Sequence, residues 1–202
     1  MSKKRQFKQS EDIRRRILEI ATRLIGEKGV DGLSVRQITK EMDYSAGIIY
    51  HYFDNKEDII ACVLREGYLQ LLKTIKPPEA GLTPDESIRV SIRNYIESFL
   101  LKPQEYKAIM LSSSPQVLGF TSLLHQGSSE ARPALMALIR SLQDGVDSGL
   151  FAPCNLELTA QAIWSAMYGL LIRLIVEQDI TTAQQTKLIE RQIEIILKGL
   201  KL

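Results

Sequence analysis

Two short helical patterns lie close together near the start of the chain, separated by the pair Asp43-Tyr44. The first covers residues 35–42 and the second covers 45–52, and each repeats apolar residues at the spacing of an α-helix. Asp43 stands where a tight turn needs the left-handed backbone that aspartate tolerates. Two short helices joined in this way, after a longer amphipathic helix, are typical of a helix-turn-helix. We expect the second helix to bury Ala46, Ile49 and Phe53.

The remainder of the chain also carries helical signals. Only 6% of the residues are aromatic, and few β-branched runs lie between turns, so a sheet protein is not expected. We predict an all-α fold with about nine helices. The first is capped by Ser10 and ends near Gly29, and later helices cover roughly 84–101, 103–111, 115–125, 129–148, 155–177 and 181–200.

The double proline at 77–78 is the best domain boundary in the sequence, because two prolines cannot continue a helix. We predict a helix-turn-helix domain over residues 1–54 and a connecting helix over 55–76. A second helical domain is expected over 77–202.

Three stretches have the form of a capping box, in which a residue at the start of a helix and a Glu or Gln three residues later satisfy free backbone N–H groups. They begin at Ser34, Asp54 and Thr83. In the third, Pro84 stands at the first helical position, which suits its fixed backbone angle.

The second short helix has an unusual outer face. If the three residues named above are buried, then Gly47, Ile48, Tyr50, His51 and Tyr52 lie on or beside the opposite face. Single exposed apolar residues are normal, but an isoleucine and two tyrosines together are rare on a solvated helix. Against DNA, the same residues fit. A glycine permits close approach, an isoleucine can touch a thymine methyl group, a histidine can bind a base edge, and a tyrosine hydroxyl can reach a phosphate.

Charge is distributed unevenly along the chain. Residues 1–76 hold 15 Lys and Arg against 11 Asp and Glu, whereas residues 77–202 hold 11 against 13. A basic front part on a slightly acidic body indicates that only the front meets a polyanion, although a difference this small is also compatible with chance. Lys56 adds a positive charge beside the free N–H groups at the start of the next helix, a further phosphate clamp.

Other functional classes find little support. Cys62 and Cys154 lie far apart in apolar helical surroundings, so we expect two reduced core thiols, without a disulfide or a metal site. With two histidines, no Gly-rich phosphate loop and no metal-ligand spacing, neither an enzyme nor a cofactor is expected. The N-terminal residues lack the apolar stretch of a signal peptide, and the longest apolar segment, 162–176, contains Arg173 and is too short for a bilayer. A cytoplasmic protein is expected.

The segment ILEIATRLIGEKGVDGLSVRQITKEMDYSAGIIYHYFDNKEDII resembles the N-terminal domain of TetR-family (tetracycline-repressor-like) transcriptional regulators, and the resemblance covers residues 13–60. It implies a sequence-specific DNA-binding regulator, usually a repressor that a small molecule releases from a palindromic operator. Near the phosphates, it implies Ser34, Arg36, Tyr50, Tyr52 and Lys56. Near the bases, it implies Ser45, Ala46, Gly47, Ile48 and His51.

The sequence departs from the family pattern at three places. Thr39 stands where a small alanine is usual, and Asp43-Tyr44 replaces the common Gly-Val of the turn. Tyr52 occupies a position often held by histidine. The change in the turn bears on the tilt of the second helix, and it makes Tyr44 a candidate contact to the DNA backbone.

Beyond about residue 65, the resemblance implies only an architecture, a helical effector-binding and dimerisation domain over 77–202. One helix-turn-helix contacts one half-site, so high specificity calls for a symmetric partner. We expect a homodimer through the last two helices, built from Trp164, Met167, Tyr168, Leu171, Leu174, Ile189, Ile193, Ile196, Leu197 and Leu200. The alternative is that these residues only complete the core of one chain.

The same domain is expected to bind a small apolar or amphipathic effector, because such pockets are mostly apolar with a few polar groups. The candidate lining residues are Tyr95, Phe99, Tyr106, Met110, Phe120, Met136, Trp164 and Tyr168. Arg173 either pairs with Glu177 one turn later or meets an anionic effector, and the pair is favoured. The alternative function is a helical ligand-binding or interaction module without specific DNA binding.

Overall fold

The computed structural model describes residues 3–177 and 179–201, with side chains from Lys8 onward. The N-terminal residues on which the absence of a signal peptide is argued lie partly outside this range. Within it, the chain forms ten α-helices and one short 3-10 helix, and no strand. The predicted all-α fold with an N-terminal helix-turn-helix is confirmed.

The chain divides into two compact units. The first contains residues 1–69 and 108–121, and the second contains residues 70–107 and 122–202. The helices α4 (Lys56–Thr74) and α6 (Pro103–Met110) contribute residues to both units. A segment from the middle of the chain therefore packs with the N-terminal part, and no single cut in the chain separates the two units.

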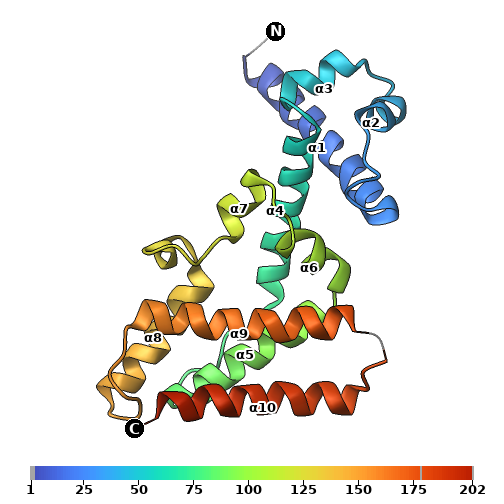
Figure 1. Ribbon diagram of the computed structural model, residues 1–202. Helices are drawn as coiled ribbons and strands as arrows, with labels where there is room; N and C mark the ends of the chain where they lie inside the picture. Colours follow the sequence, from blue (N-terminus) through green and yellow to red (C-terminus); the bar gives the residue numbers. More distant parts are fainter. Residues whose placement is uncertain (1–2, 178, 202) are drawn as a thin grey trace. The chain divides into compact units, whose positions relative to one another are not determined.

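The first unit is built on three N-terminal helices, α1 (Lys3–Lys28), α2 (Val35–Met42) and α3 (Ala46–Tyr52). α1 packs against α2, and α2 packs against α3 (Figure 1). The beginning of α4 and the short helix α7 (Pro115–Thr121) complete the unit. Its core consists of Ile17, Leu18, Ala21, Leu24, Leu33, Ile38, Met42, Ile49, Phe53, Ile59 and Val63.

The turn between α2 and α3 forms as the sequence predicts. Asp43 has φ 56° and ψ 42°, the left-handed conformation, and the N–H of Tyr44 donates to the carbonyl oxygen of Thr39 at 3.1 Å. The end of α1 is also as expected, because Gly29 has a positive φ of 76°. Its start is not: α1 begins at Lys3, so Ser10 lies inside the helix and does not cap it.

Of the three predicted capping boxes, only the third is formed. At the start of α5, the N–H of Thr83 donates to Glu86 Oε2 at 2.9 Å. Ser34 is the N-cap of α2, but its hydroxyl makes no capping hydrogen bond. At the start of α4, the cap is Asn55, whose Oδ1 accepts from the N–H of Asp58 at 2.8 Å, so the prediction of Asp54 was wrong by one residue.

The second unit is a bundle of four long helices, α5 (Pro84–Leu100), α8 (Pro133–Asp147), α9 (Leu156–Val176) and α10 (Thr182–Leu200). α5 packs against each of the other three, and α9 packs against α8 and α10. In Figure 1, α5 lies between α9 and α10. The core of the bundle includes Ile88, Ile92, Tyr95, Ile96, Phe99, Leu142, Ala160, Met167, Leu171, Ile193 and Leu197.

Two of the predicted helices are shorter than expected. The helix predicted over 115–125 ends at Thr121, and beyond it Gln161 Nε2 donates to the carbonyl oxygen of Leu123 at 2.8 Å. The helix predicted over 129–148 is split into a 3-10 turn, η1 (Ser128–Ala131), and α8. Arg132 between them is extended, with φ −127° and ψ 92°, the conformation that a following proline favours.

The cysteines and the apolar helix α9 also differ from expectation. Cys62 is half-buried and Cys154 is exposed, so Cys154 is not a core thiol; both are free. α9 spans 21 residues, and among the helices of the described residues it is the one long and apolar enough to cross a membrane by length and composition. It packs against three other helices, and a central helix of a bundle passes the same test.

Candidate nucleic-acid interface

The helix α3 has one side in the core and one side outside it. Ile49 is fully buried, and Phe53, which follows the helix, is 5% exposed. Ala46 is exposed, so the expectation that it faces the core is wrong. A helix of two turns is anchored by these two apolar side chains, and every other residue on it retains access to solvent.

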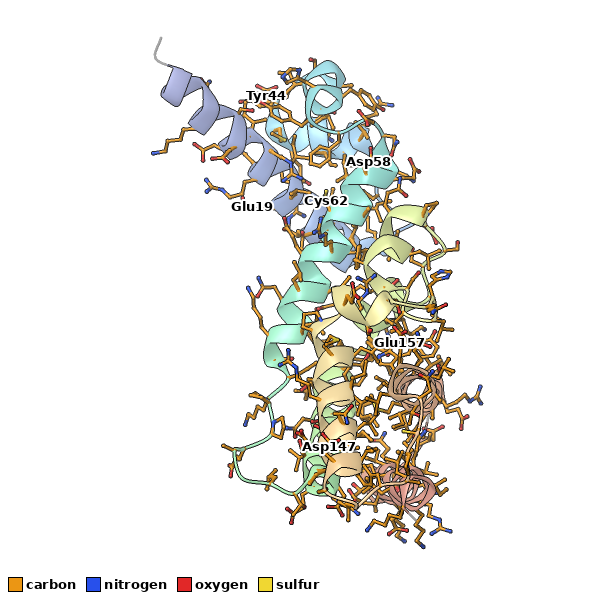
Figure 2. The ribbon with its side chains drawn as sticks, turned by 90° about the vertical axis from the view of Figure 1, so that its left-hand side faces the viewer. Glu19, Tyr44, Asp58, Cys62, Asp147 and Glu157 are labelled. Atoms are coloured by element: carbon orange, nitrogen blue, oxygen red, sulfur yellow. The ribbon has the colours of Figure 1, made fainter. Side chains whose placement is uncertain are left out.

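None of the eleven predicted DNA-contacting residues is buried in the described structure. Seven are exposed: Arg36, Tyr44, Ser45, Ala46, Gly47, Tyr50 and His51. Four are half-buried: Ser34, Ile48, Tyr52 and Lys56. All lie on α2, on the turn, on α3 or at the start of α4, and Figure 2 shows Tyr44 in the turn region.

The polar groups of this surface are not engaged elsewhere. Among the residues that the structure describes, the hydroxyls of Tyr44, Ser45 and Tyr50 form no hydrogen bond, and Arg36 and Lys56 form no ion pair. Side chains that donate hydrogen bonds to phosphate must be free to turn toward it. Exposed tyrosine hydroxyls and cations without partners meet that requirement.

Tyr52 differs from its neighbours because it contributes to the core. Its ring packs against the buried cluster of the first unit and meets the ring of His51 edge-on, with 5.2 Å between the centroids. The phenol is therefore held in place by packing. The imidazole of His51 therefore packs against a ring that is held in place, although the His51 side chain itself is exposed.

The start of α4 adds a second feature that suits an anion. The first N–H groups of a helix have no partner within the helix, and here Asn55 satisfies the N–H of Asp58. Lys56 is the first residue of the helix and stands beside the remaining groups. A phosphate at this end of α4 can bind both the positive charge of Lys56 and the free backbone N–H groups.

The departure at Thr39 has a local explanation. Its hydroxyl donates to the carbonyl oxygen of Arg36 at 3.0 Å within α2, so the extra polar group is satisfied inside the helix. The replacement at the turn is accommodated by the left-handed backbone of Asp43, and Tyr44 remains 41% exposed.

The eight candidates for an effector pocket are not brought together as one group. Five belong to an aromatic cluster of the second unit, in which successive ring centroids lie 4.6 to 6.5 Å apart: Tyr95, Phe99, Tyr106, Tyr168 and Trp164. Phe99 and Tyr106 are fully buried, and the hydroxyls of Tyr95 and Tyr106 lie 3.4 Å apart. Burial raises the pKa of the Tyr168 phenol.

The other three candidates lie elsewhere. Met136 is half-buried on α8. Met110 and Phe120 belong to the first unit, where Phe120 packs against Tyr68 with 5.7 Å between the ring centroids. Phe120 also lines a groove of that unit, together with residues that the sequence patterns did not single out.

The last two helices bury most of the residues that were expected at a dimer interface. Seven are buried within their own unit: Met167, Leu171, Leu174, Ile189, Ile193, Leu197 and Leu200. These residues complete the core of one chain, as the alternative held. Other apolar residues are exposed instead, among them Leu158 and Val176 on α9 and Leu188 and Ile195 on α10. Arg173 pairs with Glu177, as favoured, with Nε donating to Oε1 at 2.6 Å.

A two-helix motif with one buried face and one uncommitted polar and aromatic face, on an all-helical chain, defines a helix-turn-helix DNA-binding protein. Residues 17–63 match the family described as "Bacterial regulatory proteins, tetR family". Residues 17–63 therefore form a helix-turn-helix domain of the kind found in TetR-family transcription regulators.

Relatives and solved structures agree with this assignment. The chain is 26% identical to the HTH-type transcriptional regulator BetI of Rhizobium meliloti over 168 residues, which are 81% of this chain and 78% of that protein. It is 31% identical to the HTH-type transcriptional repressor AcnR of Corynebacterium efficiens over 104 residues, 47% of this chain and 54% of that protein. The fold is similar to that of the TetR-family regulator PfmR of Thermus thermophilus, with a TM-score of 0.58, 23% identity, and 93% and 100% of the two chains covered.

Proposed function

We propose that this protein is a transcriptional repressor that binds a palindromic operator as a homodimer and leaves it when a small molecule binds. The observation that carries the proposal is the outer face of α3, which presents Tyr50, His51 and Gly47, with no hydrogen bond from the tyrosine hydroxyl to any described residue. The name of the relative AcnR, a transcriptional repressor, supports repression over activation. The function needs no catalysis and no cofactor, and we place it in the cytoplasm.

The division of labour across the surface follows from the chemistry of the side chains. Tyr44, Tyr50 and Lys56 contact the DNA backbone, because hydroxyls and ammonium groups bind phosphate without regard to sequence. Ile48 and His51 meet base edges in the major groove, where methyl groups and acceptors differ between base pairs. Ser34, Arg36 and Tyr52 add backbone contacts, and the small residues Ser45, Ala46 and Gly47 let the helix approach the bases.

The homodimer forms through α9 and α10, by the exposed stripe of each. On α9, Leu158, Ala162, Ala166, Gly169 and Val176 recur at intervals of three, four or seven residues and are exposed, so they lie on one side of the helix. On α10, the corresponding stripe contains Leu188, Ile195 and Gly199. Small residues in such a stripe allow helices of two copies to approach closely.

A side chain between these stripes supports the same interface. Gln192 Nε2 donates to the carbonyl oxygen of Ala166 at 2.5 Å, which places the stripes of α9 and α10 next to each other. Gln192 Oε1 is inaccessible to solvent and has no hydrogen-bond partner among the described residues. A buried acceptor without a partner costs free energy, so this contact between the two helices leaves one polar atom unsatisfied in the single chain.

The effector binds in the second unit, beside the half-buried end of the aromatic cluster formed by Trp164 and Tyr168. These rings stack with 5.3 Å between centroids and an interplanar angle of 9°, and they retain partial access to solvent. Binding shifts the population toward a conformation in which α4 is tilted and the two recognition helices no longer match half-sites about 34–36 Å apart. A coupling of about 1–3 kcal/mol changes operator affinity roughly 5–150-fold.

The decisive experiment is a selection of DNA sequences by the purified protein, followed by fluorescence anisotropy with the recovered duplex. We expect a palindromic site whose affinity falls steeply as salt rises, because phosphate contacts release counterions. A protein that binds all duplexes equally, or none, would instead be the helical interaction module without specific DNA binding. If no small molecule altered the affinity for the recovered site, release by an effector would have to be abandoned while DNA binding stood.

A further inference from the structure

A groove of about 460 Å³ lies within the first unit, outside the aromatic cluster where we place the effector. Its lining residues come from α1, from the end of α3, from α4 and from α7, and all of them belong to residues 1–69 or 108–121. Its volume falls in the range of small-molecule sites. The charged and aromatic side chains that line it are close enough to act on one ligand.

The floor of the groove is one face of α4. Asp58, Ala61, Cys62 and Arg65 are spaced at three, four and seven residues, which brings them to the same side of the helix. Figure 2 shows Asp58 and Cys62 on α4, one turn apart. This spacing was visible in the sequence, but nothing in the sequence placed α7 opposite it.

One wall of the groove holds a cation that has no acidic partner. The guanidinium of Arg14 lies 5.2 Å from the centre of the Phe53 ring, and its Nη2 donates to Cys62 Sγ at 3.4 Å. Neither Arg14 nor Arg65 forms an ion pair with any described residue. A guanidinium offers five donors, and a thiol and an aromatic ring leave most of them unused.

The opposite wall is formed by α7. Gln116 Nε2 donates to Asp58 Oδ1 at 3.3 Å, so this carboxylate already has a donor. Phe120 offers an aromatic surface, and a side chain added at Gly119 would meet no atom within 4 Å of its Cβ, so that wall is open. Asp54 also lines the groove and is exposed, as are Arg14 and Arg65, but neither arginine forms an ion pair with a described residue. The positive charges are therefore the ones in need of a partner.

The geometry points to a binding site for a small aromatic carboxylate in this groove. The carboxylate of the ligand accepts hydrogen bonds from the guanidinium groups of Arg14 and Arg65, in the bidentate manner that arginine favours. The ring system lies between Phe53 and Phe120. Since Phe53 is also the residue that ends α3, the ligand contacts the end of the recognition helix.

The test is isothermal titration calorimetry of the full chain with 2-naphthoate, and with 2-naphthamide as an uncharged ligand of the same shape. We expect one naphthoate site per chain, and roughly tenfold weaker binding of the amide, because a hydrogen-bonded charge is lost. Arg14→Gln weakens naphthoate binding roughly tenfold and removes most of the preference over the amide. Arg14→Lys keeps part of the preference for naphthoate over the amide.

Two further variants complete the test. Arg16→Gln on the same helix removes an exposed arginine that does not line the groove, and naphthoate binding stays unchanged. Gly119→Leu fills the groove from an open position and abolishes binding of both ligands, with circular dichroism as the check on folding. Absence of binding to the wild-type chain, or binding that neither Arg14→Gln nor Gly119→Leu reduces, would overturn the site. The measurement contains no DNA, so its outcome is independent of operator binding.

Discussion

Ile49 and Tyr50 are adjacent in α3 but differ in burial: Ile49 is fully buried in the core of the first unit, and Tyr50 is 53% exposed. The buried side chain fixes the rotation of the helix about its axis. That rotation decides which residues are left outside, so the two side chains together define the surface offered to DNA.

These two positions are expected to separate stability from binding. Ile49→Ala removes a fully buried side chain and lowers the free energy of unfolding by about 2–5 kcal/mol. Tyr50→Ala changes it by less than about 0.5 kcal/mol, because the ring packs against little. Urea denaturation followed by circular dichroism measures both. Equal losses at the two positions would contradict the assigned orientation of α3.

Backbone contacts and base contacts are expected to respond differently to substitution. Lys56→Gln and Tyr50→Phe weaken binding to all duplexes alike, and Lys56→Gln also reduces the slope of log affinity against log salt by about 0.9. Ile48→Ala and His51→Gln change the difference in binding free energy between bases at one position of the site by about 1–3 kcal/mol. Anisotropy titrations against single-base variants of the operator measure both effects. Arg140→Gln on α8, an exposed arginine of the second unit, is the control and leaves affinity unchanged.

Gly47 provides a test of how closely the DNA approaches α3. A Cβ built at this position meets only Ser45 Oγ, at 3.7 Å, an ordinary contact, so Gly47→Ala leaves the free protein folded. Alanine is also the better helix former by up to about 1 kcal/mol. We expect unchanged or raised thermal stability and weaker operator binding, with Gly47→Val weaker still. Full operator affinity in both variants would show that the DNA does not approach this part of α3.

The homodimer is tested on the exposed stripe of α10. Ile195 is 59% exposed in one chain, so Ile195→Glu leaves the fold intact and places a charge in the proposed interface. We expect sedimentation to change from dimer to monomer and operator affinity to fall. Thr186→Glu is the matched control, because nine residues of helix place it on the opposite side of α10. A dimer that survives Ile195→Glu would rule out this stripe.

Glu157 makes the stability of the second unit depend on pH. The backbone N–H of Gly127, the hydroxyl of Ser129 and the N–H of Ser129 all donate to its carboxylate and lower its pKa. Because the pKa is lower in the folded state, the stabilisation is complete above the unfolded value of about 4.3 and is lost as pH falls through the folded value. Thermal unfolding between pH 7 and pH 3 is therefore expected to lose less stability in Glu157→Gln than in the wild-type chain. Identical pH profiles would contradict this role.

Several local features of both units could be predicted from local patterns. The left-handed backbone at Asp43 and the capping box from Thr83 to Glu86 depend on residues close together in the chain, and both are found. The same holds for the burial of Ile49 and Phe53, which follows from helical spacing. Ala46 was misplaced because a spacing of three residues does not say how wide the buried face is.

Tertiary packing decided what local patterns could not. The helix predicted over 115–125 ends at Thr121, and beyond it the carbonyl oxygen of Leu123 accepts from Gln161, 38 residues further along the chain. Gly145 was not singled out, yet a Cβ at this position would lie 2.0 Å from the ring of Phe151, so only glycine lets that ring pack there.

The sequence by itself determined most of the helices, the helix-turn-helix and the exposure of Gly47, Tyr50 and His51 on α3, because each depends on interactions within a few residues along the chain. Only the tertiary structure decided that residues 108–121 pack with the N-terminal unit, and that Arg14, Cys62 and Phe120 line one groove. Such neighbours are set by the packing of whole helices, and no spacing along a single helix encodes which distant helix will cover it.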